Sequence, residues 1–188
     1  MSTGTVVLIV VGVLVVLLIL YAISVYNKLV GMRNKVRDQW AQIDVQLKRR
    51  VDLIPNLVET VKGYAKHEKE TFEEVVNARN KFNSANTKEA EIEANNQITG
   101  ALNRLFALAE AYPELKANEN FISLQTDLKD TEDKISFARQ FYNDVVLTYN
   151  NLIEMFPSNI IAGMFGFKVE EFFKVESEEE RNAPKVSF

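Results

Sequence analysis

Hydrophobic residues follow two patterns along the chain, and the change between them comes near Tyr26. From Thr5 to Tyr26 nearly every residue is apolar and none carries a charge. A run of this length can cross the hydrocarbon core of a bilayer as one helix. A cleaved signal peptide is the alternative, but it would have a basic start and a shorter apolar core. The pattern therefore predicts a single transmembrane helix within residues 1–26.

After the span, apolar residues recur every three or four positions, which is the spacing of one face of a helix. This face begins at Leu29, passes Ile43, and crosses Pro55 to reach Val58. Proline inside a helix removes one backbone donor and crowds the preceding turn. The unbroken apolar face favours a kink at Pro55 over a new helix that starts there. The stretch Asp44–Glu68 is therefore predicted as one helix, continuous with the membrane span.

Two further helices are predicted after a polar break at residues 83–87. Thr87 is a suitable N-cap for the first of them, which ends near Pro113. The second runs from Phe121 to Phe156, and its apolar residues have the heptad-like spacing of a coiled coil. No segment alternates like a strand. The predicted fold is all-α: an N-terminal transmembrane helix that continues into an elongated antiparallel bundle of three or four helices.

The predicted organisation has three parts. Residues 1–26 hold a short N-terminus and the span, and residues 27–167 form the bundle. Residues 168–188 hold a short phenylalanine-rich helix, placed at about Val169–Phe173 by the local pattern, and a polar flexible tail. Exposed phenylalanines would mark an interface. They either pack on the bundle, which is the commoner fate, or contact another subunit.

Charge decides the expected orientation and excludes some partners. Four basic residues follow the span: Lys28, Arg33, Lys35 and Arg37. The positive-inside rule then predicts residues 27–188 in the cytoplasm and the N-terminus outside. These cations can also contact the anionic headgroups of the lipid bilayer. The formal net charge of -4 argues against a nucleic-acid partner. The absence of cysteine excludes disulfides, thiolate zinc sites and cysteine nucleophiles.

The sequence contains no pattern of catalytic residues. The lone histidine, His67, is followed by a glutamate as in the zinc-protease motif HExxH, but Thr71 stands where the second histidine would be. One imidazole cannot supply the usual ligand set of zinc. The acids Asp44 and Asp52 flank Lys48 at four-residue spacing, which is ordinary surface electrostatics of a helix. We therefore expect no catalytic residue, no metal site and no cofactor.

Polar residues also occupy positions near the core of the predicted bundle. A Tyr-Asn pair occurs twice, seven residues apart, and Arg139 precedes the first pair by one turn. Such residues can hydrogen-bond between helices and fix their register. Two interpretations stay open: an interhelical polar network, which is favoured, and a binding pocket. The candidate network consists of Asp44, Arg50, Arg139, Tyr142, Asn143, Tyr149 and Asn150.

Two groups of residues form a candidate partner surface. The first is the set of outward charges before Pro55, and the second is the set of phenylalanines near the C-terminal end. Each is either solvated surface or a contact with a second subunit. The candidate surface consists of Lys48, Arg49, Asp52, Phe165, Phe167, Phe172 and Phe173.

The run WAQIDVQLKRRVDLIPNLVETVKGYAKHE, from Trp40 to Glu68, resembles the bacterial LemA family. Further matches are AYPELKA from Ala111, the paired Tyr142-Asn143, and Phe156-Pro157, so that the resemblance covers nearly the whole chain. It implies a single-pass protein of the bacterial inner or plasma membrane, with a short outer N-terminus and a helical bundle inside. It also implies an accessory or scaffold role without enzymatic activity, sometimes encoded beside a membrane zinc metalloprotease of the heat-shock type.

The sequence therefore predicts a non-enzymatic, membrane-anchored scaffold or adaptor. It would form a homo-oligomer, bind other membrane proteins such as that metalloprotease, or do both. The alternative is a ligand-sensing or enzymatic bundle whose interhelical pocket contains Asp44, Arg50, Arg139 and Tyr142. A cavity where these groups converge with unpaired polar atoms would favour the sensor, whereas pairing in a dry core would count against it.

Overall fold

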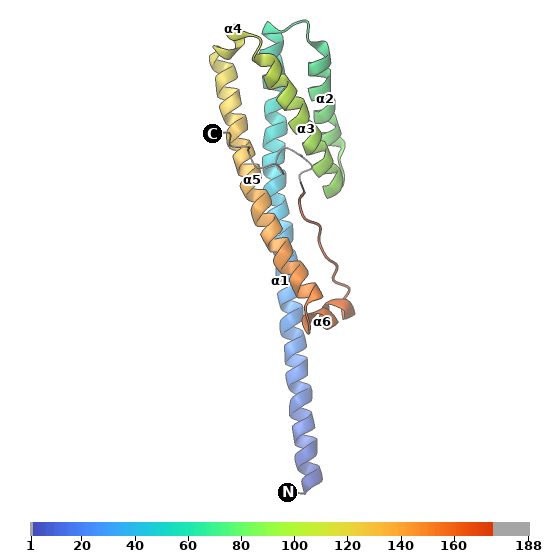
Figure 1. Cartoon of the computed structure of the whole chain (residues 1–188). Helices are drawn as coiled ribbons and strands as arrows, with labels where there is room; N and C mark the ends of the chain where they lie inside the picture. Colours follow the sequence, from blue (N-terminus) through green and yellow to red (C-terminus); the bar gives the residue numbers. More distant parts are fainter. Residues whose placement is uncertain (1, 175–188) are drawn as a thin grey trace, which may run out of the picture. The chain divides into compact units, whose positions relative to one another are not determined.

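The computed structural model describes residues 2–174, and no strand occurs within that range (Figure 1). This confirms the all-α prediction. The helices of the described chain are α1 (Thr3–Tyr64), α2 (Lys69–Ser84), α3 (Lys88–Ala109), α4 (Pro113–Lys116), α5 (Glu119–Glu154) and α6 (Ser158–Met164). The polar tail predicted within residues 168–188 lies, from residue 175 onward, outside the described residues.

Helix α1 carries the predicted span at its N-terminal end. It is long and apolar enough to cross a membrane, and none of its apolar stretch is buried by the rest of the protein. The helix has 62 residues and continues through Pro55 without ending. Pro55 is exposed, whereas Ile54 and Val58 are buried. The apolar stripe therefore crosses the proline as predicted.

One predicted boundary is wrong at the end of α1. Residues 44–68 were expected to form one helix, but α1 ends at Tyr64 and α2 begins at Lys69. The linking turn is closed by a hydrogen bond from the Glu68 amide to the Ala65 carbonyl, at 3.2 Å. Gly63 precedes it, and glycine weakens a helix by about 1 kcal/mol relative to alanine. Ala65 is buried in this turn, so the apolar stripe continues although the helix does not.

The short C-terminal helix was also placed wrongly. Residues 167–174 are not helical, and the short helix is α6, ten residues earlier in the chain. Gly166 ends α6 in the left-handed conformation, with φ of 69°. The Phe167 amide then bonds the Ala162 carbonyl at 3.0 Å, and the Gly166 amide bonds the Gly163 carbonyl at 3.3 Å. This is the Schellman arrangement, which glycine permits at little steric cost.

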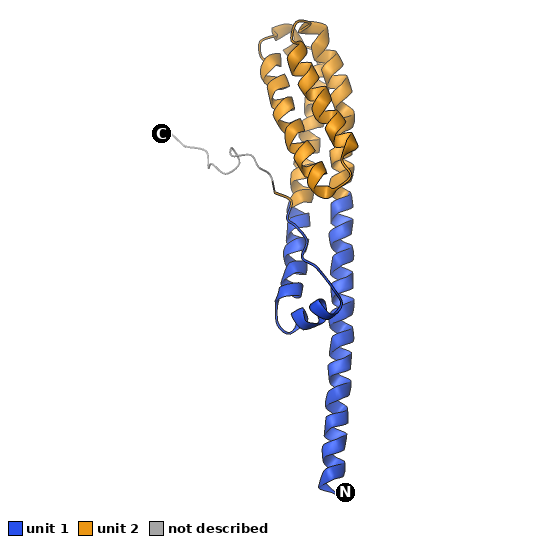
Figure 2. Ribbon diagram, turned by 90° about the vertical axis from the view of Figure 1, so that its right-hand side faces the viewer, with its two compact units in different colours: residues 1–41, 140–172 blue, residues 42–139, 173–188 orange. Residues whose placement is uncertain are grey.

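The described chain divides into two compact units (Figure 2). Unit 1 contains residues 2–41 and 140–172, and unit 2 contains residues 42–139 and 173–174. The predicted boundary between the membrane span and the bundle, at residues 26 and 27, lies inside α1. The two predicted parts thus share one helix.

Unit 2 is an antiparallel four-helix bundle made of α2, α3 and the adjoining parts of α1 and α5 (Figure 2). Successive helices reverse direction, and the short α4 leads from α3 into α5. Each helix contributes an apolar stripe to the core, as the spacing predicted. The largest contributions come from Ile43, Leu47, Ile54, Leu57, Phe72, Phe82, Ile98, Leu102, Leu105, Phe121, Leu128 and Ile135.

Unit 1 pairs the N-terminal part of α1 with the C-terminal part of α5 and includes α6 (Figure 2). Leu29 and Val36 of α1, and Val146 and Tyr149 of α5, are almost fully buried. After α6, residues 167–172 form an extended segment, which we call the C-terminal strap.

Thr87 is the N-cap of α3, as the sequence predicted, and a substitution at this residue tests its role as the cap. Its hydroxyl accepts the Ala90 amide at 3.2 Å. Thr87→Ala should lower the free energy of unfolding by about 1 kcal/mol, because that amide loses its acceptor. Thr126→Ala is the matched control, since Thr126 is equally exposed but lies within α5. Thermal unfolding of the full chain in detergent, followed by circular dichroism, measures both. Equal stabilities for the two variants would contradict the cap.

Candidate functional site

Arg50 of α1 is a buried cation in unit 2, with 2% of its surface exposed. Its Nη1 atom donates to Asn95 Oδ1 at 2.7 Å, and its Nη2 atom donates to Thr99 Oγ1 at 3.1 Å. Its Nε atom lies 2.6 Å from Glu132 Oε1. That last N–H does not point well at the carboxylate, so the contact is an ion pair rather than an aligned hydrogen bond. One guanidinium thus ties α1 to α3 and α5.

Burial dominates the electrostatics of this cluster. It lowers the pKa of the Arg50 guanidinium, and the Glu132 carboxylate opposes the shift. Burial likewise raises the pKa of Glu132, against the opposite effects of Arg50 and Arg139. Arginine remains protonated at neutral pH even so. A buried ion pair of this kind adds little net stability, but losing one partner strands the other charge.

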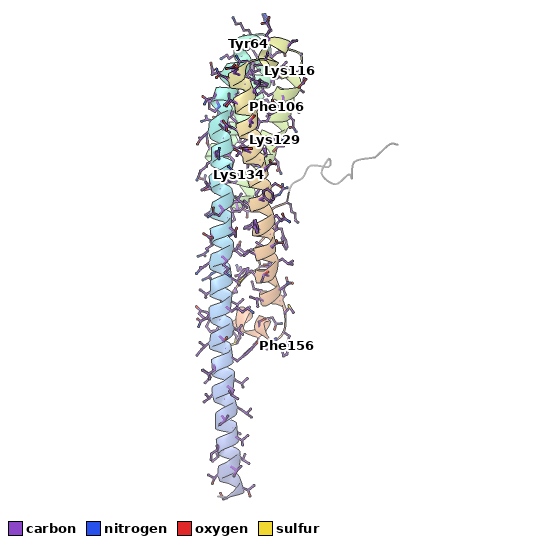
Figure 3. All side chains as sticks on the ribbon, turned by 90° about the vertical axis from the view of Figure 1, so that its left-hand side faces the viewer. Tyr64, Phe106, Lys116, Lys129, Lys134 and Phe156 are labelled. Carbon is purple, nitrogen blue, oxygen red and sulfur yellow. The ribbon has the colours of Figure 1, made fainter. Side chains whose placement is uncertain are left out.

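A cleft of about 880 Å³ opens beside this cluster. Arg50 and Glu132 lie at its edge, and most of the remaining lining comes from α3 and α5. Phe106 and Lys129, both labelled in Figure 3, contribute an aromatic and a cationic side chain to it. Each of the three guanidinium nitrogens already has a protein partner. The cleft is therefore large and is lined by both polar and apolar residues. The Arg50 guanidinium, however, is already bound by other residues of the bundle.

The residues of the sensor interpretation do not converge on this cleft. Arg50 lines it and Arg139 acts on the Glu132 carboxylate, but Asp44 and Tyr142 are absent from the lining. Asp44 instead accepts a hydrogen bond from Lys48 at 2.7 Å, as the predicted ladder requires. The four groups therefore take part in separate interactions and do not line one pocket.

Two side chains of the repeated Tyr-Asn pairs, Tyr142 and Asn150, hold the C-terminal strap within unit 1. The Tyr142 hydroxyl donates to the Glu171 carbonyl at 3.0 Å. The Asn150 side chain donates to the Glu170 carbonyl and accepts the Glu170 amide, both at 2.9 Å. These hydrogen bonds of Tyr142 and Asn150 join α5 to the strap, whereas the predicted network was to join helices. Tyr149, which is buried, and Asn143, which is half-buried, lie on the same helix.

Aromatic contacts hold the beginning of the strap against α1 within unit 1. The Tyr26 ring lies 4.8 Å from the Phe165 ring and 5.8 Å from the Phe167 ring, between centroids. The Arg33 guanidinium stands 5.2 Å from the centroid of Phe167, a cation–π geometry. Trp40 meets Tyr142 edge to face at 5.5 Å.

The candidate partner surface is only partly exposed. Lys48, Arg49 and Asp52 are all exposed on α1. The phenylalanines differ from one another: Phe165 is 58% exposed and Phe172 is 37% exposed, whereas Phe167 is half-buried and Phe173 is 3% exposed. Phe173 is therefore a core residue and does not belong to an accessible surface.

A group of exposed apolar residues at α6 could not be predicted from helical periodicity. Five large apolar side chains in and around this helix are exposed, and we call them the α6 patch: Met155, Phe156, Ile160, Met164 and Phe165. The signal in the sequence is the absence of any charged residue from 155 to 167. Within the described residues, no cluster of three or more histidines or carboxylates could hold a metal ion.

The burial of Arg50 predicts which ion pairs matter for stability. Glu132→Ala leaves the buried guanidinium without its carboxylate and should lower the free energy of unfolding by about 2 kcal/mol, less than for a fully buried pair because the Glu132 side chain is 40% exposed. Glu74→Ala is the control, because Glu74 pairs with Arg104 at a similar 2.7 Å but at the surface. It should cost less than about 1 kcal/mol. Thermal unfolding in detergent compares the two, and equal losses would show that burial of Arg50 has no consequence.

The Asn150 contacts predict how the strap is held. Asn150→Ala removes both hydrogen bonds to Glu170, each worth about 1 kcal/mol, so the Glu170 amide should exchange with solvent more than about tenfold faster. Asn151→Ala, at an exposed neighbour, should leave this rate unchanged. Hydrogen exchange followed by mass spectrometry measures the strap peptide and an α5 peptide together. Unchanged exchange in the Asn150→Ala strap would contradict the assignment.

Comparison with known proteins gives relatives of moderate similarity. Protein LemA of Metamycoplasma hominis is 29% identical over 140 residues, covering 72% of this chain and 63% of the relative. Magnetosome protein MamQ 2 of Paramagnetospirillum magneticum is 27% identical over 175 residues, covering 79% and 64%. Magnetosome protein MamQ of Magnetospirillum gryphiswaldense is 25% identical over 174 residues, with the same coverage. The chain thus spans less than two thirds of the length of each relative.

The family comparison covers most of the chain. The LemA family model matches residues 39–188, which include all of α2 to α6 and the part of α1 that contains Arg50. Together with the resemblance of the Trp40–Glu68 run, this match shows that the chain belongs to the LemA family.

Proposed function

We propose that this protein is a membrane-anchored helical scaffold, which acts by contacting copies of itself or other membrane proteins and catalyses no reaction. The observation that carries the proposal is the continuity of α1. A single helix contains the apolar stretch that can span a membrane and also supplies the first helix of the unit 2 bundle. This continuity supports a bundle that is anchored to the bilayer through α1.

The chemistry of the described residues supports a role without catalysis. The His67 side chain is exposed in the turn between α1 and α2. The most buried cation, Arg50, is held by three protein partners. The names of the relatives, LemA and magnetosome protein MamQ, state no reaction. A scaffold needs an anchor and an accessible surface, and the apolar stretch of α1 and the exposed residues of the same helix support both.

The surface proposed for partners lies on α1 in unit 2. Lys48, Arg49 and Asp52 are exposed there, and the neighbouring Val45 is 58% exposed. An exposed aliphatic side chain surrounded by charges of both signs suits a contact that is polar at its rim. The same helix contains the span, so this surface is available to proteins held in the same bilayer.

The orientation proposed is the one that places the bundle in the cytoplasm of a bacterial cell. It is supported by Lys28, Arg33, Lys35 and Arg37, which follow the apolar stretch directly. Their positive charges favour the inner face of the membrane, where anionic lipids also attract them.

A ligand-binding bundle is the second candidate, and the cleft beside Arg50 is the observation that favours it. Against it stands the pairing of Arg50 with Asn95, Thr99 and Glu132, which leaves the guanidinium committed to the protein. The scaffold is therefore the better supported of the two functions.

Cysteine crosslinking in cells tests the scaffold directly, because the chain has no cysteine of its own. Arg49→Cys should crosslink to a second copy or to another membrane protein, since the residue is exposed on the proposed surface. Lys116→Cys, on α4, is the control at an exposed position away from that surface. Mass spectrometry of the crosslinked products identifies the partner.

Two outcomes would contradict these proposals. Equal crosslinking at both positions would reject the surface on α1. A chain that stays monomeric in the membrane, and that an amine-reactive crosslinker joins to no other protein, would reject the scaffold itself.

A further inference from the structure

The burial pattern of α6 is the reverse of the usual one for a helix at a protein surface. Its small residues Ser158 and Ala162 face inward and are 8% and 1% exposed. Its larger apolar residues Ile160 and Met164 face outward and are 53% and 73% exposed. Both pairs are four residues apart, so each lies along one side of the helix. Large apolar side chains concentrated outside mark a contact surface.

The residues on either side of α6 extend this apolar surface. Phe156 is 79% exposed, and Met155 and Phe165 are 62% and 58% exposed. Figure 3 shows Phe156 at the end of unit 1 where α6 lies. Charges begin again only at Glu154 and Lys168. The α6 patch therefore presents several large apolar groups with no charge among them, which water solvates poorly.

Contacts within unit 1 place this patch at the end of the membrane span. Tyr26 is the last residue of the apolar run, and its ring lies 4.8 Å from the ring of Phe165. Tyrosine is enriched at the level of lipid headgroups, where its ring is buried and its hydroxyl is wet. Phe165 belongs to the patch, so the patch is continuous with the position where α1 leaves the hydrocarbon.

Basic residues complete a surface that suits a bilayer. Arg33 stacks on Phe167, next to the patch, and Lys28 and Arg37 lie on the same part of α1. An apolar side that enters the boundary of the acyl chains, next to cations at the headgroups, is the arrangement of interfacial membrane helices.

We propose that the α6 patch lies in the lipid bilayer interface, as a second and shallow membrane contact of the same protein beside its transmembrane helix. The inference rests on the proposed membrane anchoring of α1. With two contacts, the C-terminal end of α5 is held to the membrane surface as well as the N-terminal end of α1, so unit 1 is fixed at two points.

Lipid-quenched fluorescence of single-cysteine variants tests this proposal. The full chain is reconstituted in vesicles of phosphatidylcholine and phosphatidylglycerol, some of which carry a nitroxide on the acyl chain. An environment-sensitive fluorophore is attached at Met164→Cys, in the patch. Leu14→Cys, in the span, is the positive control. Phe137→Cys is the negative control, because Phe137 is also a large exposed apolar residue, at 62% against 73% for Met164, but lies in unit 2.

We expect the label at position 164 to be quenched by the nitroxide lipids several-fold more than the label at 137, and to be shielded from aqueous iodide. If only the label at position 14 is quenched, the inference is wrong and the anchor stands. If the label at 14 is not quenched either, the anchor fails and the inference fails with it. Shielding from iodide without lipid quenching would show that protein, such as a second copy, covers the patch, and this also overturns the proposal.

A second variant separates insertion from mere proximity. Ile160→Asp places a carboxylate on the patch, and it should reduce the lipid quenching at position 164 to the level at 137. Ile160→Leu should leave the quenching unchanged. The single tryptophan, Trp40, packs on Tyr142 in unit 1, so an unchanged emission spectrum shows that this unit keeps its fold. Unaltered quenching in the aspartate variant would reject the proposal.

Discussion

One constraint governs the proposed membrane anchor, on which the rest of the structure depends: a backbone inside lipid must satisfy its own hydrogen bonds. The apolar stretch meets this constraint as a helix, and that helix does not end where the stretch ends but continues to Tyr64. Helix nucleation is costly and extension is not, so a helix already formed is readily extended into neighbouring residues. The first helix of unit 2 is consequently a continuation of the helix that contains the apolar stretch. The remaining helices of unit 2 then have an apolar stripe on which to pack.

Charge and aromatic contacts add specificity to a core that is otherwise made of aliphatic stripes. Arg50 is a costly residue to bury, but its three partners come from two other helices and depend on one register of the bundle. In unit 1 the Asn150 side chain fixes the alignment of the strap on α5. Its amide group donates one hydrogen bond and accepts another, as a peptide group does. An apolar stripe tolerates sliding by one turn, whereas such paired polar contacts do not. These polar residues are therefore best understood as determinants of alignment.

Much of the fold could be predicted because its signals are local. The uncharged span, the three- and four-residue spacing of core positions, and the cap at Thr87 each depend on a few neighbouring residues. The end of α1 could not be predicted from spacing, because Ala65 remains buried in the turn that follows. The hydrogen-bond partner of Asn150 could not be predicted either. Helical periodicity indicates that a side chain faces inward, but it does not indicate which residue that side chain contacts. The site at Arg50 was anticipated as polar and near the core, but its separation from Tyr142 required the three-dimensional structure.

The position of Pro55 has a consequence for how a proline can remain inside so long a helix. A proline leaves the carbonyl four residues earlier, here that of Val51, without its amide partner. Pro55 is exposed, so its ring lies on the solvent side of α1, where a backbone group without a partner can be hydrated. A proline at the buried position of Ile54 would instead leave an unpaired carbonyl against the core. The solvated face is thus the side of this turn where the rigid ring is compatible with an uninterrupted helix.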